Sequence, residues 1–186
     1  MDIKRKISLL GVDLVLILLA SCNSLSPSEH LLVGAWYTIF NVEEDGGESV
    51  LECTTKYLDD KTFVVNGTAR YSIKADGIDV TTIIIMDISG KGTWSIYDKI
   101  LKEQLTSANV KITDVDFSGD DVTNNLEQLN KARESARKNA YFEMVIPLKK
   151  ELLKETSSRI IKLNDKELVE KDDDGNTSEH KRVDDE

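Results

Sequence analysis

Residues 78–88 read IDVTTIIIMDI, a run in which apolar and polar side chains alternate. One face of an extended chain would carry Ile78, Val80, Ile84, Met86 and Ile88, and the other Asp79, Thr81 and Asp87. This period of two is typical of an antiparallel strand with one face in the core and the other in water.

The same alternation occurs in the stretches before this run. Leu51, Cys53 and Tyr57 form one apolar face, and Ala69, Tyr71 and Ile73 form another. Turn signals separate the runs, namely Asp45-Gly46-Gly47, Asp59-Asp60, Asn66-Gly67, Asp76-Gly77 and Gly90-Lys91-Gly92. Short strands at such spacing favour a barrel or sandwich. We therefore predict a mainly β fold of antiparallel strands, either a barrel or a sandwich.

The period changes to that of a helix after Thr123. The apolar positions are Leu126, Leu129, Ala132, Ala136 and Ala140. Asn124 and Glu127 resemble a capping box, and Pro147 stands where a second helix would begin. We predict a helical segment over about residues 124–155. Strand patterns then return at 159–163, 167–170 and 179–183, and Asp173-Asp174-Gly175-Asn176 predicts a hairpin between the last two.

The N-terminus has the order of a secretory signal peptide. Lys4-Arg5-Lys6 is basic, Ile7 to Leu19 is mostly apolar, and the small residues Ala20 and Ser21 precede Cys22. A membrane-spanning helix needs about 20 apolar residues in a row, and this stretch is shorter and interrupted. The alternative is an uncleaved anchor helix with Cys22 buried in it.

Leu19-Ala20-Ser21-Cys22 resembles the lipobox of bacterial lipoproteins. The resemblance implies cleavage between Ser21 and Cys22, a diacylglyceryl group on the thiol, and acylation of the new amine, for example by palmitate. It divides the chain into a signal peptide (1–21), a lipidated Cys with a tether (22–32) and a domain (33–186). In enteric members an Asp after the Cys favours the inner membrane, so Asn23 favours the outer membrane.

Gly34-Ala35-Trp36 near the start of the domain and Arg182-Val183 near its end resemble the lipocalin-like domains of bacterial lipoproteins. The resemblance implies an antiparallel up-and-down, lipocalin-like barrel with the helical segment before its last strands. It implies that Gly34 opens the first strand and that Trp36 packs against Arg182 to close the barrel floor. It also implies binding of a small apolar molecule inside the barrel. The candidate cavity residues are Tyr71, Ile84, Met86 and Trp94. The alternative is that these four side chains fill the core.

The formal charge of −10 argues against nucleic acid as a partner and against anionic membrane surfaces. Membrane attachment therefore needs the lipid on Cys22. Cys53 is then the remaining cysteine, and its position on an apolar face predicts a buried, inert thiol. His30 and His180 are predicted to be exposed, and neither has a second ligand at zinc spacing.

Residues 114–120, DVDFSGD, resemble the start of a calcium loop. The twelfth position of that loop is Asn125, where calcium requires a Glu, so an acidic turn before the helix is the better interpretation. No nucleophile elbow, phosphate loop or dinucleotide motif occurs in the sequence. We predict no catalytic residues, no cofactor and no metal.

These observations predict a lipid-anchored cell-envelope lipoprotein that binds a small hydrophobic ligand in a β-barrel. The alternative is a partner-binding or structural envelope lipoprotein with a filled barrel, whose working surface is the helical segment 124–155. A minimal barrel does not need that segment, so an envelope protein partner is a second prediction.

Overall fold

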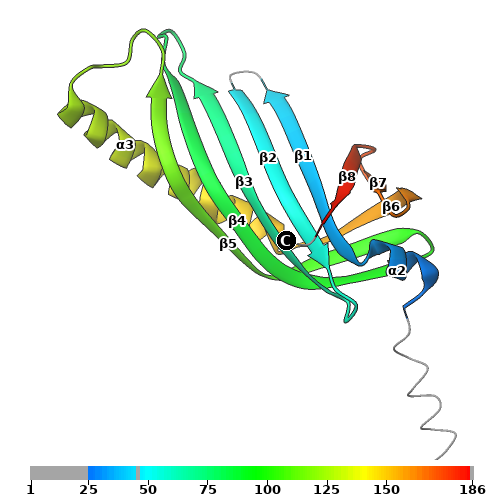
Figure 1. Ribbon diagram of the computed structural model, residues 1–186. Helices are drawn as coiled ribbons and strands as arrows, with labels where there is room; N and C mark the ends of the chain where they lie inside the picture. Colours follow the sequence, from blue (N-terminus) through cyan, green and yellow to red (C-terminus); the bar gives the residue numbers. More distant parts are fainter. Residues whose placement is uncertain (1–24, 45–46, 185–186) are drawn as a thin grey trace, which may run out of the picture.

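The structure, a computed structural model, describes residues 25–44 and 47–184. Eight antiparallel strands follow one another around a closed ring, and the last strand returns to pair with the first (Figure 1). The strands are β1 (Gly34–Glu44), β2 (Gly47–Tyr57), β3 (Thr62–Lys74), β4 (Thr81–Tyr97), β5 (Ile100–Ser118), β6 (Glu155–Leu163), β7 (Glu167–Asp172) and β8 (Thr177–Val183). The helices are α2 (Pro27–Leu32), α3 (Leu126–Ala140) and α4 (Ile146–Leu152). The predicted up-and-down barrel with a helical segment before the last strands is confirmed.

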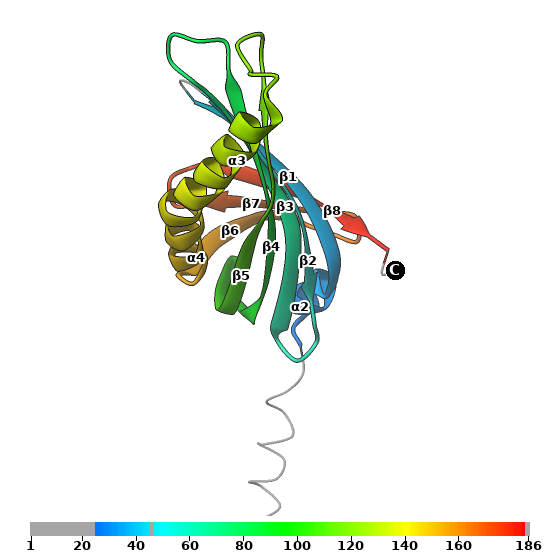
Figure 2. The same ribbon diagram turned by 90° about the vertical axis from the view of Figure 1, so that its left-hand side faces the viewer.

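The barrel is closed at one end only. β1 pairs with β8 over Ala35–Tyr37, and β5 pairs with β6 from Ile100 to Gln104. Beyond these pairs β1 to β5 continue as a curved five-stranded sheet (Figure 1). The helices α3 and α4 lie against β5 (Figure 2). The molecule is therefore a short barrel extended by a sheet that carries a helical cover.

Two groups of buried side chains follow from this arrangement. The closed-end core consists of Leu32, Trp36, Tyr57, Phe63, Trp94, Leu101, Ile160 and Leu168. The helix-side core consists of Ala69, Ile84, Met86, Ile88, Val110, Ile112, Val115, Ala140 and Val145. The face of β4 predicted to be buried is buried at Ile84, Met86 and Ile88, whereas Ile78 precedes the strand and is exposed.

The helical segment differs from the prediction in two details. Asn125, rather than Asn124, caps α3, and its side chain accepts two backbone N–H groups of the first turn. Pro147 lies in the first turn of α4, as predicted, but no loop separates α4 from α3. A π-helical turn, Tyr141–Val145, joins α3 to α4, and within it the N–H of Ile146 donates to the carbonyl of Tyr141. A π-helical turn is a common place for a helix to absorb an irregularity such as a nearby proline.

Two predicted turns are wrong. Asn66-Gly67 lies inside β3, and Gly90-Lys91-Gly92 lies inside β4, where the register shifts between Lys91 and Gly92. A Cβ on Gly67 would come 2.5 Å from the carbonyl oxygen of Glu52, so this glycine allows close strand packing rather than a turn. The turn from β4 to β5 is instead Asp98-Lys99, and both residues have positive φ, as hairpin turns require.

The predicted tether is wrong over its second half. Pro27–Leu32 forms α2, and Ser26 with Glu29 forms a capping box at its start. Leu32 is fully buried, and the indole N–H of Trp36 donates to the carbonyl of Leu32 at 2.7 Å. The folded part of the chain thus starts before the predicted boundary at residue 33.

Candidate functional site

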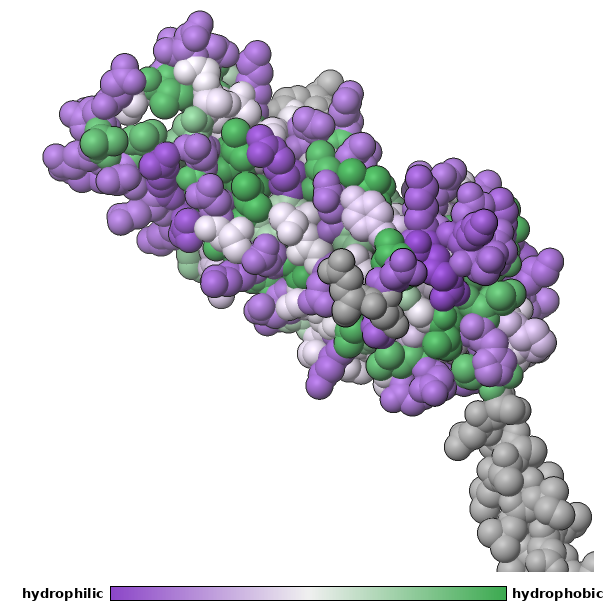
Figure 3. Space-filling model, viewed as in Figure 1, coloured by the Kyte–Doolittle hydropathy of each residue, from purple (hydrophilic) through white to green (hydrophobic). Residues whose placement is uncertain are grey.

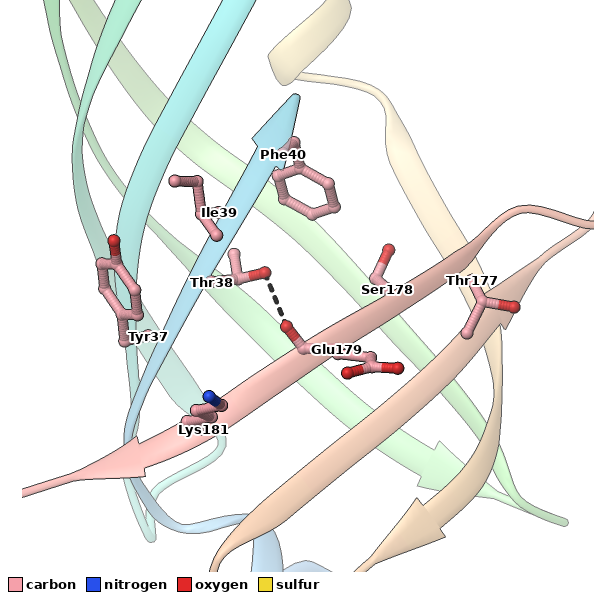
Figure 4. Close-up of a pocket in the computed structure, with 8 residues that line it drawn as sticks. All are labelled: Tyr37, Thr38, Ile39, Phe40, Thr177, Ser178, Glu179 and Lys181. Carbon is pink, nitrogen blue, oxygen red and sulfur yellow. Dashed lines mark hydrogen bonds between the residues drawn. The ribbon is translucent and has the colours of Figure 1, made fainter. Parts of the chain in front are cut away.

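A pocket lies where the barrel wall opens between β1 and β8. The two strands separate after the pair formed by Tyr37 and Lys181, and the hydroxyl of Thr38 donates to the carbonyl of Glu179 at 2.9 Å. The pocket has a volume of about 400 Å³. Figure 4 shows the residues that line it, Tyr37, Thr38, Ile39, Phe40, Thr177, Ser178, Glu179 and Lys181. We call this pocket the β1–β8 gap.

The gap is bounded by side chains from both faces of the barrel wall. Thr38, Phe40 and Ser178 lie on the inward face, in step with buried Trp36 and His180. Ile39 and Glu179 lie on the opposite face of the same strands, and Ile39 is 47% exposed. The gap therefore has an outer mouth and an inner wall.

A cluster of polar side chains, Tyr57, Glu103, Ser158, Glu170 and His180, lies inside the closed end of the barrel. Tyr57, Glu170 and His180 are buried, and Glu103 and Ser158 are half-buried. The hydroxyl of Tyr57 donates to Glu103 Oε1 at 2.7 Å, and the hydroxyl of Ser158 donates to Glu170 Oε2. Nε2 of His180 is 2.9 Å from Glu170 Oε1. Five different strands (β2, β5, β6, β7 and β8) supply these side chains, so barrel closure alone brings them together.

His180 connects the cluster to the gap. Its neighbours in β8, Ser178 and Glu179, line the gap, and its ring meets the ring of Phe40 edge-on with the centroids 6.5 Å apart. Phe40 therefore contacts both the pocket and the His180 ring.

Burial sets the protonation of the cluster. It raises the pKa of Glu103 to about 7, and the negative charge of Glu170 raises it further, while the Tyr57 hydrogen bond and the charge of His180 oppose the shift. Burial also raises the pKa of Tyr57 well above its usual value. The cluster therefore contains a carboxyl group that gains and loses its proton near neutral pH.

The predicted exposure of His180 is wrong. This residue is 9% exposed because it lies on the inward face of β8, whereas His30 is exposed as predicted. Nε2 of His180 has no hydrogen-bond partner among the described residues, so its contact with Glu170 is an ion-pair distance without hydrogen-bond alignment. An imidazole nitrogen left in this state is costly unless another group approaches it.

The residues predicted to close the barrel are in contact. The guanidinium carbon of Arg182 is 4.4 Å from the ring centroid of Trp36, and Arg182 donates to the carbonyls of Leu31 and Val33. Gly34 has φ of +131°, and a Cβ there would lie 2.2 Å from Arg182 Nη1. Glycine at this position leaves the space that the guanidinium occupies.

The four predicted cavity residues do not share a cavity. Ile84 and Met86 belong to the helix-side core, with Tyr71 packed against it, whereas Trp94 belongs to the closed-end core. Ile84, Met86 and Trp94 are at most 4% exposed, and none of the four lines the β1–β8 gap. Their positions correspond to the alternative prediction, in which they fill the core.

The structure describes the acidic run that resembles a calcium loop but not the predicted lipidation site. The acidic run at residues 114–120 lies mostly within β5, and Asp116 pairs with Arg133 at 2.6 Å. No group of three or more His, Cys, Asp or Glu within residues 25–44 and 47–184 is arranged to hold a metal. Ser21 and Cys22, the predicted cleavage and lipidation site, lie outside the described residues.

The sequence does contain a pattern that accompanies the polar cluster, namely glutamates within apolar strand faces. Glu103 stands between Leu101 and Leu105, and Glu170 stands two residues after Leu168, so both carboxylates interrupt an apolar face. A charged residue in that position is either buried with partners or marks an open face, and the pattern alone does not decide between them.

No protein-family model matches the chain, and no curated protein matches it. Across the part of the chain that the structure describes, no helix combines the length and apolar character needed to cross a bilayer. A function for the chain is therefore inferred from the geometry of the gap and the cluster.

Proposed function

We propose that the chain is a lipid-anchored lipoprotein of a bacterial cell envelope that binds a small, largely apolar ligand at the β1–β8 gap. The anchoring part rests on the basic Lys4-Arg5-Lys6 segment and on the resemblance of residues 19–22 to a lipobox. The binding part rests on the pocket between β1 and β8.

The volume of the gap is the observation that supports binding most directly. About 400 Å³ lies within the range of roughly 300–1,000 Å³ that small-molecule sites occupy. Phe40 and Ile39 supply apolar contact, and Thr38, Ser178 and Glu179 supply hydrogen-bonding groups around it. Because the closed-end core fills the barrel floor, we place the ligand at the gap rather than in the centre.

The hydropathy and the charge of the surface support attachment to the membrane through a covalent lipid rather than by adsorption. Hydrophilic residues spread over the face in Figure 3, with hydrophobic residues in small groups between them. The net charge of −10 opposes adsorption to anionic lipid. Attachment then depends on the acyl chains at Cys22, and Asn23 favours the outer membrane as the destination.

Native mass spectrometry tests the binding proposal. Residues 23–186 include the whole described fold and are exported behind a cleavable signal, purified without detergent and measured before and after organic extraction. We expect an additional mass that extraction removes. Ser178→Trp, which fills the gap, should abolish that mass, and Ile161→Trp, at an exposed position, should retain it. A clean protein mass that persists after exposure to fatty acids and envelope lipids would contradict the proposal.

The anchor has its own test. Cells that express the full chain are labelled with a fatty-acid analogue, and Cys22→Ala should abolish the labelling. Cys53→Ala should leave it unchanged, because Cys53 lies inside the fold. Labelling that persists in Cys22→Ala would place the lipid elsewhere.

A second candidate function is partner binding through the helical segment. Tyr141, Phe142 and Ile146 are 51%, 57% and 47% exposed, although they are large apolar side chains on adjoining turns. Replacing all three by Ser should remove protein partners from an envelope pull-down if this surface is used. An unchanged partner set would count against this function.

A further inference from the structure

We infer that the outward face of the helical segment docks the anchored domain onto an anionic lipid bilayer and thereby sets its orientation at the membrane. This inference rests on the proposed function, because the lipid on Cys22 supplies the attachment and the helical face supplies the orientation. It assigns a lipid surface, rather than a protein, to the exposed residues Tyr141, Phe142 and Ile146. Exposure, local charge and the short length of chain to the anchor support it.

The helical segment presents apolar side chains on two opposite faces. Ala140 is buried in the helix-side core, whereas Phe142 and Ile146 are 57% and 47% exposed. Lys138, Phe142 and Ile146 follow one another at intervals of four residues, so they lie along one stripe of the helix. A surface helix ordinarily carries a single apolar stripe, which faces the core. We call this second stripe the outward helical face, and it consists of Lys138, Tyr141, Phe142, Ile146, Lys149, Lys150 and Leu153.

The outward helical face is basic within an acidic protein. Residues 138–154 contain four lysines and two glutamates, whereas the whole chain has a formal charge of −10. The lysines of the helical segment that form ion pairs are Lys131 and Lys154. Lys138, Lys149 and Lys150 are exposed, and none of them forms an ion pair with a described residue. Lysines without such partners beside exposed apolar side chains are suited to the negative headgroups and the acyl boundary of a bilayer.

Charge disfavours a second copy of the chain as the occupant of this face. In an antiparallel pairing of two helical faces centred on Met144, Lys138 of one copy would stand opposite Lys150 of the other, and two lysines in that position repel each other. An exposed apolar stripe with cations along it is instead complementary to an anionic surface.

The anchor holds the domain close to a bilayer. Pro27, the first residue of α2, follows Cys22 by five positions, and an extended chain spans at most about 3.6 Å per residue, so the fold begins within roughly 18 Å of the lipid. α2 lies against β6, and α4 leads into β6. Figure 2 shows both helices in the lower half of the molecule. A bilayer held this close has a high effective concentration, which favours lipid over a soluble acidic protein as the occupant.

The net negative charge of the protein does not prevent this contact. At physiological ionic strength the Debye length is about 8 Å, so only charges close to the headgroups act strongly on them. The rest of the chain is more acidic than the whole, and its repulsion from the bilayer favours the orientation in which the outward helical face meets the lipid. Attachment itself still depends on the covalent lipid.

Fluorescence quenching on vesicles tests the inference. Residues 22–186 include the whole described fold, and in a Cys53→Ala background Cys22 is their one thiol, which is coupled to a maleimide lipid. The vesicles contain phosphatidylcholine with brominated acyl chains, with or without about 30% phosphatidylglycerol as the anionic lipid. After subtraction of the signal of the two native tryptophans, the emission of Phe142→Trp should fall by about twofold or more in the anionic vesicles. Ile78→Trp, at a 53% exposed position before β4, should not be quenched.

Charge reversal tests the contribution of the unpaired lysines. One variant changes three lysines of the outward helical face, by Lys138→Glu, Lys149→Glu and Lys150→Glu. The matched control changes three exposed lysines of other elements, by Lys74→Glu, Lys91→Glu and Lys166→Glu. Each lysine near an anionic surface contributes about fivefold to the contact equilibrium, so the first variant should lose the quenching of Phe142→Trp and the control should keep it.

The outcomes separate the inference from the proposed function. Quenching of Phe142→Trp that does not exceed that of Ile78→Trp would overturn the inference and leave the face to a protein partner. Equal quenching with and without phosphatidylglycerol would overturn the recognition of anionic lipid, and an equal loss in both lysine variants would reduce the effect to net charge and overturn the site. Because the coupling replaces the native lipid, fatty-acid labelling that persists in Cys22→Ala counts against the proposed anchor and does not alter this test.

Discussion

The guanidinium group of Arg182 lies over the indole ring of Trp36, and the same group donates to the main-chain carbonyls of Leu31 and Val33. One side chain from the last strand thus contacts the first strand and the end of α2. Trp36 strengthens the arrangement because its own N–H donates to Leu32. Barrel closure therefore depends on a contact between residues near the two ends of the described chain.

Arg182→Met should lower the free energy of unfolding by about 2–4 kcal/mol, since it removes a cation–π contact and two charged hydrogen bonds. Urea unfolding followed by Trp fluorescence measures the loss. Arg70→Met, at an exposed position on β3, is the matched control and should change little. A loss as small as that of the control would mean that Arg182 does not hold the barrel closed.

Gly34→Ala should destabilise the protein by about 1–3 kcal/mol, because φ is +131° and the new methyl group would meet Arg182. In an Arg182→Met background the cost should be smaller, since the closest contact is gone. Gly77→Ala measures backbone strain alone, because Gly77 has φ of +77° and nothing within 4 Å of the added atom. Equal costs in both backgrounds would argue against the Gly34–Arg182 contact.

Glu103→Gln should change how stability depends on pH. Because burial raises the pKa of Glu103 from 4.5 to about 7, the folded state binds the proton more tightly than the unfolded state does. The stability that this proton contributes is complete below about pH 4.5 and is lost as the pH increases through 7. At pH 8 the variant should therefore be more stable than the parent by about 3 kcal/mol.

The measurement is a series of urea unfolding curves from pH 5 to pH 8. The difference between variant and parent should grow across that window. Glu52→Gln, on the exposed outer face of β2, should show no such growth. A constant difference between the Glu103→Gln variant and the parent would mean that Glu103 stays ionised inside the barrel.

Cys53 should react slowly with iodoacetamide. Burial, and then the charge of Glu103, raises the pKa of this thiol to about 11, so at pH 8 about one molecule in a thousand carries the thiolate. Residues 23–186 contain no other cysteine. Mass spectrometry should find alkylation at least about 100-fold slower than in urea-unfolded protein. Similar rates in both states would place the thiol in contact with solvent.

The alternation of side chains was sufficient to predict a mainly β fold of antiparallel strands. Ile84, Met86 and Ile88 are buried as their spacing indicates, and the period change after Thr123 does mark the helical segment. These features depend on residues close together in the chain, which is why they can be predicted. The Trp36–Arg182 contact came from a resemblance, and spacing alone would not have suggested it.

The misassigned turns have a different cause. A glycine in a turn and a glycine in a crowded strand give the same local pattern, and Gly67 is crowded by Glu52 from the neighbouring strand. The turn at Asp98-Lys99 was missed because it contains no glycine, although both residues adopt positive φ.

The candidate site depends on pairing over long distances in the chain. The burial of Glu170 and His180 requires the closure of β8 on β1, and the gap exists because that pairing stops after Tyr37. No local pattern in β1 or β8 indicates where their pairing ends. Sequence reasoning therefore placed the ligand among core residues such as Met86 and Trp94.

The pairing of β1 with β8 spans three residue pairs, whereas β1 pairs with β2 along its full length of eleven residues. A pulling force on the N-terminal segment passes through α2 into β1 at the position of this short ladder. Because the hydrogen bonds between two strands share a load, the strand pair with the fewest hydrogen bonds would separate first. Under tension β1 would separate from β8, and the barrel would become an open sheet in which β1 to β5 and the helices stay joined.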